Sequence, residues 1–211
     1  MLSAKDLVVG YRRGRPVLDG VDVELHPGAT LGLAGPSACG KSTLAAVLAL
    51  LLEPWSGSVT LDGQPVRGFR HRAPATQRTA IGVVFQQPRL AVEPRWTLDA
   101  VVRAPLVASR RRDDGIVAEL TEAVGLTREL LARRPHEVSD GQLQRACLAR
   151  ALVLRPRYLI CDEMTSMVDA STTALLVRLV RSVAAEGTGV LAVSHDDALL
   201  EAWADDVVRW R

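Results

Sequence analysis

Residues 30–43, TLGLAGPSACGKST, constrain the possible folds of this chain more than any other segment. They read as a short apolar strand, then G-x-x-x-x-G-K-[ST], then the start of an apolar helix. Gly35 and Gly40 allow the loop to turn its backbone N–H groups inward, and the positive end of the helix dipole lies beside them. The segment therefore predicts a phosphate-binding loop between a strand and a helix of an α/β sheet.

In such a loop Lys41 reaches the β- and γ-phosphates, and the Ser42 hydroxyl ligates Mg²⁺. The alternative is a chance glycine-rich turn that contains a solvated lysine, and the flanking strand and helix argue against it. The ATP-binding residues expected from this segment are Gly35, Pro36, Ser37, Ala38, Cys39, Gly40, Lys41, Ser42 and Thr43.

A second segment, RYLICDE at residues 157–163, supplies carboxylates for the same chemistry. It is an apolar strand that ends in two acids, and strand ends in open α/β sheets face the ligand crevice. We therefore expect Asp162 to hold Mg²⁺ and Glu163 to orient and deprotonate the attacking water. An acidic loop that caps the next helix is the alternative for these two residues alone.

The apolar pattern along the 211 residues predicts a single α/β domain. Strands are expected at 7–11, 21–25, 30–34, 58–61, 81–85, 158–161, 190–194 and 206–210. Helices are expected at 41–52, 98–107, 114–124, 141–154, 170–186 and 197–204. Because the pattern from 87 to 157 is wholly helical, this stretch is expected to sit beside the sheet as an insertion.

Composition excludes several classes of protein. Hydrophobic residues make up 48% of the chain and charged residues 24%, which argues against a largely disordered protein. The net charge of +2 is too small to imply a nucleic-acid partner. Cys39, Cys147 and Cys161 are widely spaced, so they predict neither a metal site nor a disulfide. The longest apolar run, 44–52, is well short of the ~20 residues that a membrane span needs.

The segment VSDGQLQR at residues 138–145 resembles the signature motif, LSGGQ, of ABC ATPases. With this landmark, other elements of that family follow in order along the chain. Tyr11 resembles the aromatic residue that stacks on adenine, Gln86 the Q-loop glutamine and His195 the switch histidine. Residues 166–169, SMVD, resemble the D-loop and end at Asp169. The resemblance extends from residue 7 to residue 206.

The resemblance implies the fold of an ABC ATPase cassette, which is a P-loop NTPase core with a mixed sheet, an antiparallel β subdomain and a helical insertion. Residues 1–211 then form one domain, with the core at 1–86 and 158–211 and the helical subdomain at about 87–157. It also implies hydrolysis of ATP with Mg²⁺. The catalytic residues would be Glu163, His195 and Gln86, and the metal ligands Ser42, Gln86 and Asp162. The signature residues, which would contact ATP bound to a second subunit, are Ser139, Asp140, Gly141 and Gln142.

Two departures from the family pattern stand out. Asp140 replaces the first glycine of SGG, and its carboxylate should repel a triphosphate unless the side chain points away. Met167 and Val168 replace the usual small residue and leucine of the D-loop, which bears on packing at the dimer interface.

Residues 86–106, QQPRLAVEPRWTLDAVVRAPL, are similar to the Q-loop and coupling segment of peptide and nickel importer ATPases, although Glu93 stands where asparagine is usual. This similarity implies a cytoplasmic subunit on the inner face of the membrane. Its partners would be a second ABC ATPase subunit, identical or different, transmembrane permease subunits and a substrate-binding protein. Leu90, Val92 and Trp96 would either dock the permease or pack the helical insertion. The alternatives are a soluble ABC ATPase, an ABC exporter subunit and a small-molecule kinase.

Overall fold

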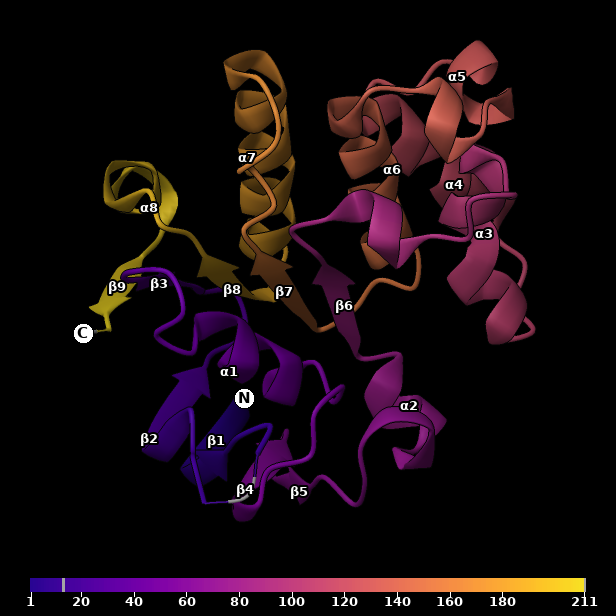
Figure 1. Ribbon diagram of the computed structural model, residues 1–211. Coiled ribbons are helices and arrows are strands. Elements are labelled where there is room, and N and C mark those ends of the chain that lie inside the picture. Colours follow the sequence, from indigo (N-terminus) through magenta and orange to yellow (C-terminus); the bar gives the residue numbers. More distant parts are fainter. Residues whose placement is uncertain (13, 211) are drawn as a thin grey trace.

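The computed structural model describes residues 1–12 and 14–210, whose strands divide between two sheets (Figure 1). The antiparallel sheet has the order β2-β1-β4-β5 and the parallel sheet the order β6-β7-β8-β3-β9. The strands of the first are β1 (Leu2–Val9), β2 (Leu18–Leu25), β4 (Ser56–Leu61) and β5 (Gln64–Pro65). The strands of the second are β3 (Thr30–Ala34), β6 (Ile81–Val84), β7 (Tyr158–Asp162), β8 (Gly189–Val193) and β9 (Asp206–Arg209).

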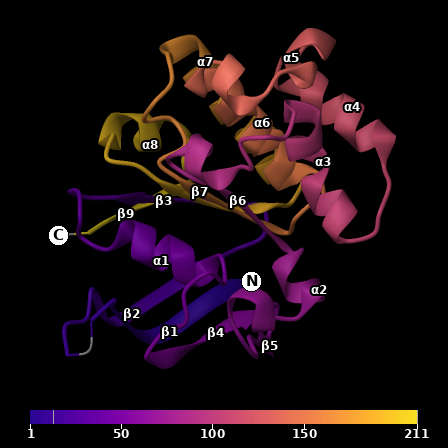
Figure 2. The ribbon, with the colours of Figure 1, turned by 45° about the vertical axis from the view of Figure 1, so that its right-hand side comes forward.

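The helices lie on the two faces of the parallel sheet. Helix α1 (Lys41–Leu48) lies between the two sheets, and the helices that follow β6 lie on the opposite face of the parallel sheet (Figure 2). The other α-helices are α2 (Ala75–Arg78), α3 (Leu98–Ala108), α4 (Asp114–Ala123), α5 (Arg128–Ala132), α6 (Asp140–Leu152), α7 (Ala170–Ala185) and α8 (Asp197–Trp203). Short 3₁₀ helices are η1 (Arg70–Arg72), η2 (Pro88–Ala91) and η3 (Pro135–Glu137).

Two apolar cores explain why the chain forms these layers. Strands β7 and β8 are buried along nearly their whole length, because helices or a second sheet cover both faces. One core joins this sheet to α6, α7 and α8, and the other surrounds α1. Between β6 and β7 the described residues form helices and loops and no strand, in agreement with the helical pattern read from 87 to 157.

Several element boundaries differ from the sequence-based expectation. Strand β1 begins at Leu2 and ends at Val9, whereas the apolar pattern predicts 7–11. Its alternation is interrupted because the register shifts between Ala4 and Leu7, where Asp6 has a φ of 51°. Helix α1 ends at Leu48, short of the predicted 52, because Leu50 adopts a left-handed φ of 59°. Within residues 1–12 and 14–210, no helix is long and apolar enough to cross a bilayer.

Candidate functional site

The register of the parallel sheet brings the predicted site residues to one edge. Leu33 of β3 and Asp162 of β7 both lie opposite Val193 of β8, so the three strands end at the same level. The segments that leave these ends carry the glycine-rich loop, Glu163 and His195. Residues far apart in the chain therefore meet at the carboxyl edge, where open α/β sheets bind ligands.

The loop from Gly35 to Gly40 has the backbone shape that a phosphate cradle needs. Gly35, Ala38 and Gly40 have φ values of 146°, 66° and 103°, which place them in or near left-handed backbone regions. A Cβ on Gly35 would lie 2.7 Å from the Trp210 carbonyl oxygen. Gly40 is the N-cap of α1 and provides no side-chain cap, so the first-turn N–H groups face the loop without one.

Lys41 lies across this loop and is only 4% exposed. Its ammonium donates to the carbonyl oxygens of Gly35 at 2.7 Å and Pro36 at 2.8 Å. Since an ammonium carries three donors, these bonds hold the charge inside the loop and still leave it able to bind a phosphate oxygen.

Ser42 and Asp162 form the part of the site that suits a divalent cation. The Ser42 hydroxyl donates to Asp162 Oδ1 at 3.0 Å, across 120 residues of sequence. Burial raises the pKa of Asp162, and the nearby Glu163 carboxylate adds to the rise, whereas Ser42 and Lys41 oppose it. A hydroxyl and a carboxylate are ligands that Mg²⁺ prefers, and a cation would favour the ionised acid. These two residues therefore fit Mg²⁺, with the remaining positions open to phosphate oxygens and water.

Glu163, Gln86 and His195 form a second cluster at the same edge. The Gln86 amide donates to Glu163 Oε2 at 2.6 Å, and His195 Nδ1 lies 3.5 Å from the same oxygen. The Glu163 side chain is 13% exposed, so it is held between its neighbours and still reaches solvent. A carboxylate in this setting can accept a proton from a water molecule beside the glycine-rich loop.

Gln144 was not singled out from the sequence, although it connects this cluster to α6. It is 1% exposed and donates to the carbonyl oxygens of Phe85 at 3.1 Å and Met164 at 3.0 Å. Phe85 precedes Gln86, and Met164 follows Glu163, so one amide joins the backbone of both catalytic candidates to the signature helix. The sequence did contain a signal for Gln144. It lies four residues before Leu148 and eight before Leu152, so it is a polar residue on the buried face of the predicted helix.

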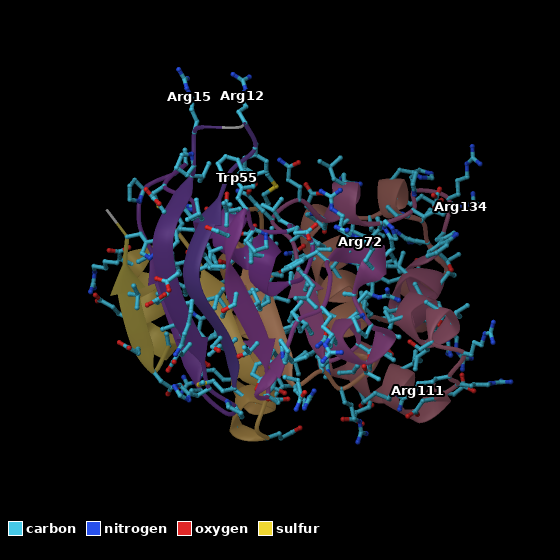
Figure 3. All side chains as sticks on the ribbon, turned by 90° about the horizontal axis from the view of Figure 1, so that it is seen from below. Arg12, Arg15, Trp55, Arg72, Arg111 and Arg134 are labelled. Atoms are coloured by element: carbon cyan, nitrogen blue, oxygen red, sulfur yellow. The ribbon has the colours of Figure 1, made fainter. Side chains whose placement is uncertain are left out.

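Tyr11 lies two residues beyond the end of β1 and is 69% exposed. Its hydroxyl lies 3.3 Å from the Thr43 hydroxyl, which ties the aromatic ring to the end of the glycine-rich segment. Figure 3 shows Arg12 and Arg15 extending away from the body of the molecule, with Trp55 closer to it. An exposed ring next to the loop can stack on a base.

The signature residues begin helix α6. Ser139 is the N-cap, and its hydroxyl accepts from Gln142 N at 3.2 Å while Gln142 Oε1 accepts from Ser139 N at 3.0 Å. Among the described residues, no hydrogen bond or ion pair joins residues 139–142 to residues 35–43. The structure thus brings the glycine-rich loop and the cluster around Glu163 to one edge of the sheet, whereas the signature has no such bond to the loop of its own chain within the described residues.

Asp140 pairs with Arg89 of η2, whose Nε lies 2.7 Å from Asp140 Oδ1. The sequence drew attention to the carboxylate but not to this partner, because 50 residues separate the two in the chain. The unopposed charge considered from the sequence is therefore neutralised in the structure.

The D-loop aspartate begins the next long helix. Asp169 is the N-cap of α7 and accepts from Ser171 Oγ at 2.5 Å and from Thr172 N at 2.9 Å. These bonds, the Ser171 hydroxyl first, hold the pKa of Asp169 well below its usual range. Val168 packs against the core, whereas Met167 is exposed.

The apolar residues after Gln86 were expected either to dock a permease or to pack the helical insertion, and the structure divides them between exposed and packed positions. Leu90 is 83% exposed and Trp96 46%, whereas Val92 packs against the core. A groove of about 460 Å³ is lined by residues of α2, β6, α3 and α6, and none of residues 86–96 lines it. Leu90 and Trp96 are therefore exposed apolar side chains, as docking requires, whereas Val92 is not.

Comparison with known families and proteins agrees with this geometry. The family described as "ABC transporter" matches residues 18–166. The glutathione import ATP-binding protein GsiA of Pectobacterium atrosepticum is 40% identical over 86% of this chain, which spans 30% of that protein. The di/tripeptide transport ATP-binding protein DppF of Pseudomonas aeruginosa is 36% identical over 99% of this chain and 69% of its own length. The nickel import ATP-binding protein NikE of Escherichia coli is 36% identical over 94% of this chain and 76% of its own length.

Solved structures resemble the fold over its whole length. A dimeric structure of MJ0796, a bacterial ABC transporter cassette, has a TM-score of 0.89 and 25% identity, covering 100% of this chain and 94% of that one. A dimeric post-hydrolysis state of the same cassette bound to ADP and Pi gives the same values.

Proposed function

Because the chain belongs to the ABC transporter family, we propose that it is the ATP-hydrolysing subunit of a membrane importer, working as one of two cassettes that close over ATP. As a member of this family it is an ATPase, and its fold is that of the ABC ATPase cassette. The proposal concerns the residue roles, the partners and the direction of transport.

The observation that carries the proposal is the cluster formed by Glu163, Gln86 and His195 beside the glycine-rich loop. We assign Glu163 as the general base, since it lies at a strand end and accepts a hydrogen bond from Gln86 that orients it. His195 would donate toward the γ-phosphate side of the site. Lys41 would bind the β- and γ-phosphates, and Tyr11 would stack on adenine.

Mg²⁺ bound by Ser42 and Asp162 would neutralise charge on the phosphates. The Asp162 carboxylate and the Ser42 hydroxyl would orient that ion, and Gln86 would contribute a further ligand beside phosphate oxygens and water. Gln86 also donates to Glu163, so a single side chain would connect the metal with the base.

The signature residues support the dimer. Ser139, Gly141 and the first N–H groups of α6 form an anion site that its own glycine-rich loop does not reach. A second chain, identical or different, would supply the triphosphate for it, with the D-loop Asp169 nearby. The dimeric form of the MJ0796 cassette supports this arrangement.

The exposure of Leu90 and Trp96 supports a transmembrane partner. Both residues are exposed next to the Q-loop, where movement of α3 and α6 against the sheet would be transmitted. The relatives named for import of peptides, nickel and glutathione favour an importer over an exporter or a soluble ABC ATPase. In this proposal the chain lies on the inner face of the cell membrane, with permease subunits and a substrate-binding protein as partners.

The test measures ATP-driven dimerisation by sedimentation velocity. Glu163→Gln should bind ATP, lose hydrolysis by about three orders of magnitude and accumulate as a closed dimer. Adding Ser139→Ala should abolish that dimer, because the serine would contact the partner's γ-phosphate.

Thr127→Ala is the matched control for this test, since Thr127 is the N-cap of α5 and lies outside the site. The Thr127→Ala protein should lose a similar helix cap and still dimerise. A dimer that survives Ser139→Ala would refute the composite site. If the parent does not dimerise with itself, mixing with a second ATPase subunit has to restore both the dimer and hydrolysis.

A further inference from the structure

Arg89 holds three groups of the segment that leads into the signature helix. Its Nη1 donates to the Pro135 carbonyl oxygen at 2.6 Å and its Nη2 to the Val138 carbonyl oxygen at 3.0 Å. Its Nε lies 2.7 Å from Asp140 Oδ1. The segment that follows β6 runs beside α6, which brings η2 to the start of that helix (Figure 1). The Arg89 guanidinium therefore holds the backbone just before the signature motif in place. It also contacts Asp140, the acidic residue of that motif.

The charge at Asp140 has opposite effects on the helix and on a ligand. A carboxylate in the first turn of α6 interacts favourably with the helix dipole. The same carboxylate beside Ser139 and Gly141 repels a triphosphate that approaches this helix end. Because Arg89 lies in contact with it, the pair is neutral, and the N–H groups of the helix dominate the field that an incoming anion meets.

Folding stability alone does not account for this pair. The Arg89 and Asp140 side chains are 45% and 42% exposed, and ion pairs at that exposure contribute little to stability. Asp140 Oδ1 itself is buried and accepts no hydrogen bond within the described residues, so its contact with Arg89 is one of charge. Their position at the mouth of an anion site makes them important for a charged ligand, since repulsion acts on the whole triphosphate.

We propose that Arg89 is the counter-ion that allows Asp140 to stand in the signature motif, and that it thereby sets the affinity of this helix end for the partner's ATP. The inference rests on the composite site proposed above. Arg89 is a positioning residue in this scheme, because it acts on the ligand through the charge of Asp140.

The experiment measures the dimer affinity of the Glu163→Gln protein with saturating ATP by sedimentation velocity, at low and high NaCl. Arg89→Gln should weaken the dimer about tenfold or more at about 0.05 M salt, because it uncovers the Asp140 carboxylate at both sites. At about 1 M salt, where the Debye length is about 3 Å, the loss should shrink below about threefold. Adding Asp140→Asn to Arg89→Gln should restore the parent affinity to within about twofold.

The rescue separates the charge from the structural contacts. Arg89→Gln also removes the bonds to Pro135 and Val138, and neither salt nor Asp140→Asn would compensate for their loss. Arg95→Gln is the matched control, since Arg95 follows η2 and forms no ion pair within the described residues. It should leave the dimer affinity unchanged.

Two failures are distinguishable. A Glu163→Gln parent that forms no ATP-dependent dimer, alone or with a second subunit, would overturn the composite site itself. If the parent dimerises and Arg89→Gln has the same dimer affinity, only the role of Arg89 is overturned. The same holds if Arg89→Gln lowers the dimer affinity and Asp140→Asn does not restore it.

Discussion

Gln144→Leu removes the amide that joins the signature helix to Phe85 and Met164, the neighbours of Gln86 and Glu163. The substitution leaves the carbonyl oxygens of Phe85 and Met164 without this donor in a site that is 1% exposed. Each buried carbonyl that loses its partner costs about 1–3 kcal/mol, so the two together cost about 2–6 kcal/mol. Burial of the leucine side chain returns about 1–2 kcal/mol. From the midpoints of these ranges we expect a net loss of about 2.5 kcal/mol in the free energy of unfolding, within limits of about 0–5 kcal/mol, measured by urea denaturation.

The same substitution should slow hydrolysis more than it weakens ATP binding. Gln86 and Glu163 are adjacent to the two carbonyls, and a displacement of about 1 Å at a catalytic group costs up to about a hundredfold in rate. Single-turnover hydrolysis with saturating ATP should therefore fall about ten- to a hundredfold. The Kd for ATP should stay within about twofold, because Gln144 does not contact the glycine-rich loop.

Gln77→Leu is the control, since Gln77 donates to the Pro65 carbonyl oxygen at the surface, away from the site. It should change the free energy of unfolding by less than about 1 kcal/mol. If Gln144→Leu has the same midpoint of urea unfolding as the parent protein, the argument from the buried carbonyl groups is refuted. Normal single-turnover hydrolysis by the folded variant would refute the positioning of Gln86 and Glu163.

Lys41→Ala should weaken ATP binding at least about a hundredfold, because it removes the charge held inside the loop by Gly35 and Pro36; calorimetric titration with unchanged affinity would contradict the phosphate-binding role. His195→Ala should lower single-turnover hydrolysis without changing the Tm, since the side chain is 58% exposed and contributes little to packing. Unchanged hydrolysis would contradict the role proposed for His195, and the Tm is the control for folding.

Local constraints explain what the sequence could determine. The strand at 30–34 and the loop that follows it were predicted with their observed bounds, because two glycines and a lysine at fixed spacing between apolar runs allow few other structures. The long helices at 98–107 and 170–186 also agree with α3 and α7 to within a residue, since their periodic apolar faces extend over several turns. Elements as short as β5, α2 and α5 were missed because two to five residues carry no measurable period.

Only the tertiary structure decided which of these residues meet. The Gln86 and Glu163 contact spans 77 residues and the Ser42 and Asp162 contact 120, and both depend on the order and register of parallel strands. The sequence identified the residue types at the strand ends. It did not indicate the register that places the carboxyl ends of β3, β7 and β8 side by side. The charge on Asp140 was evident from the sequence, whereas its neutralisation by Arg89 follows from the packing of η2 on α6, which no local pattern encodes.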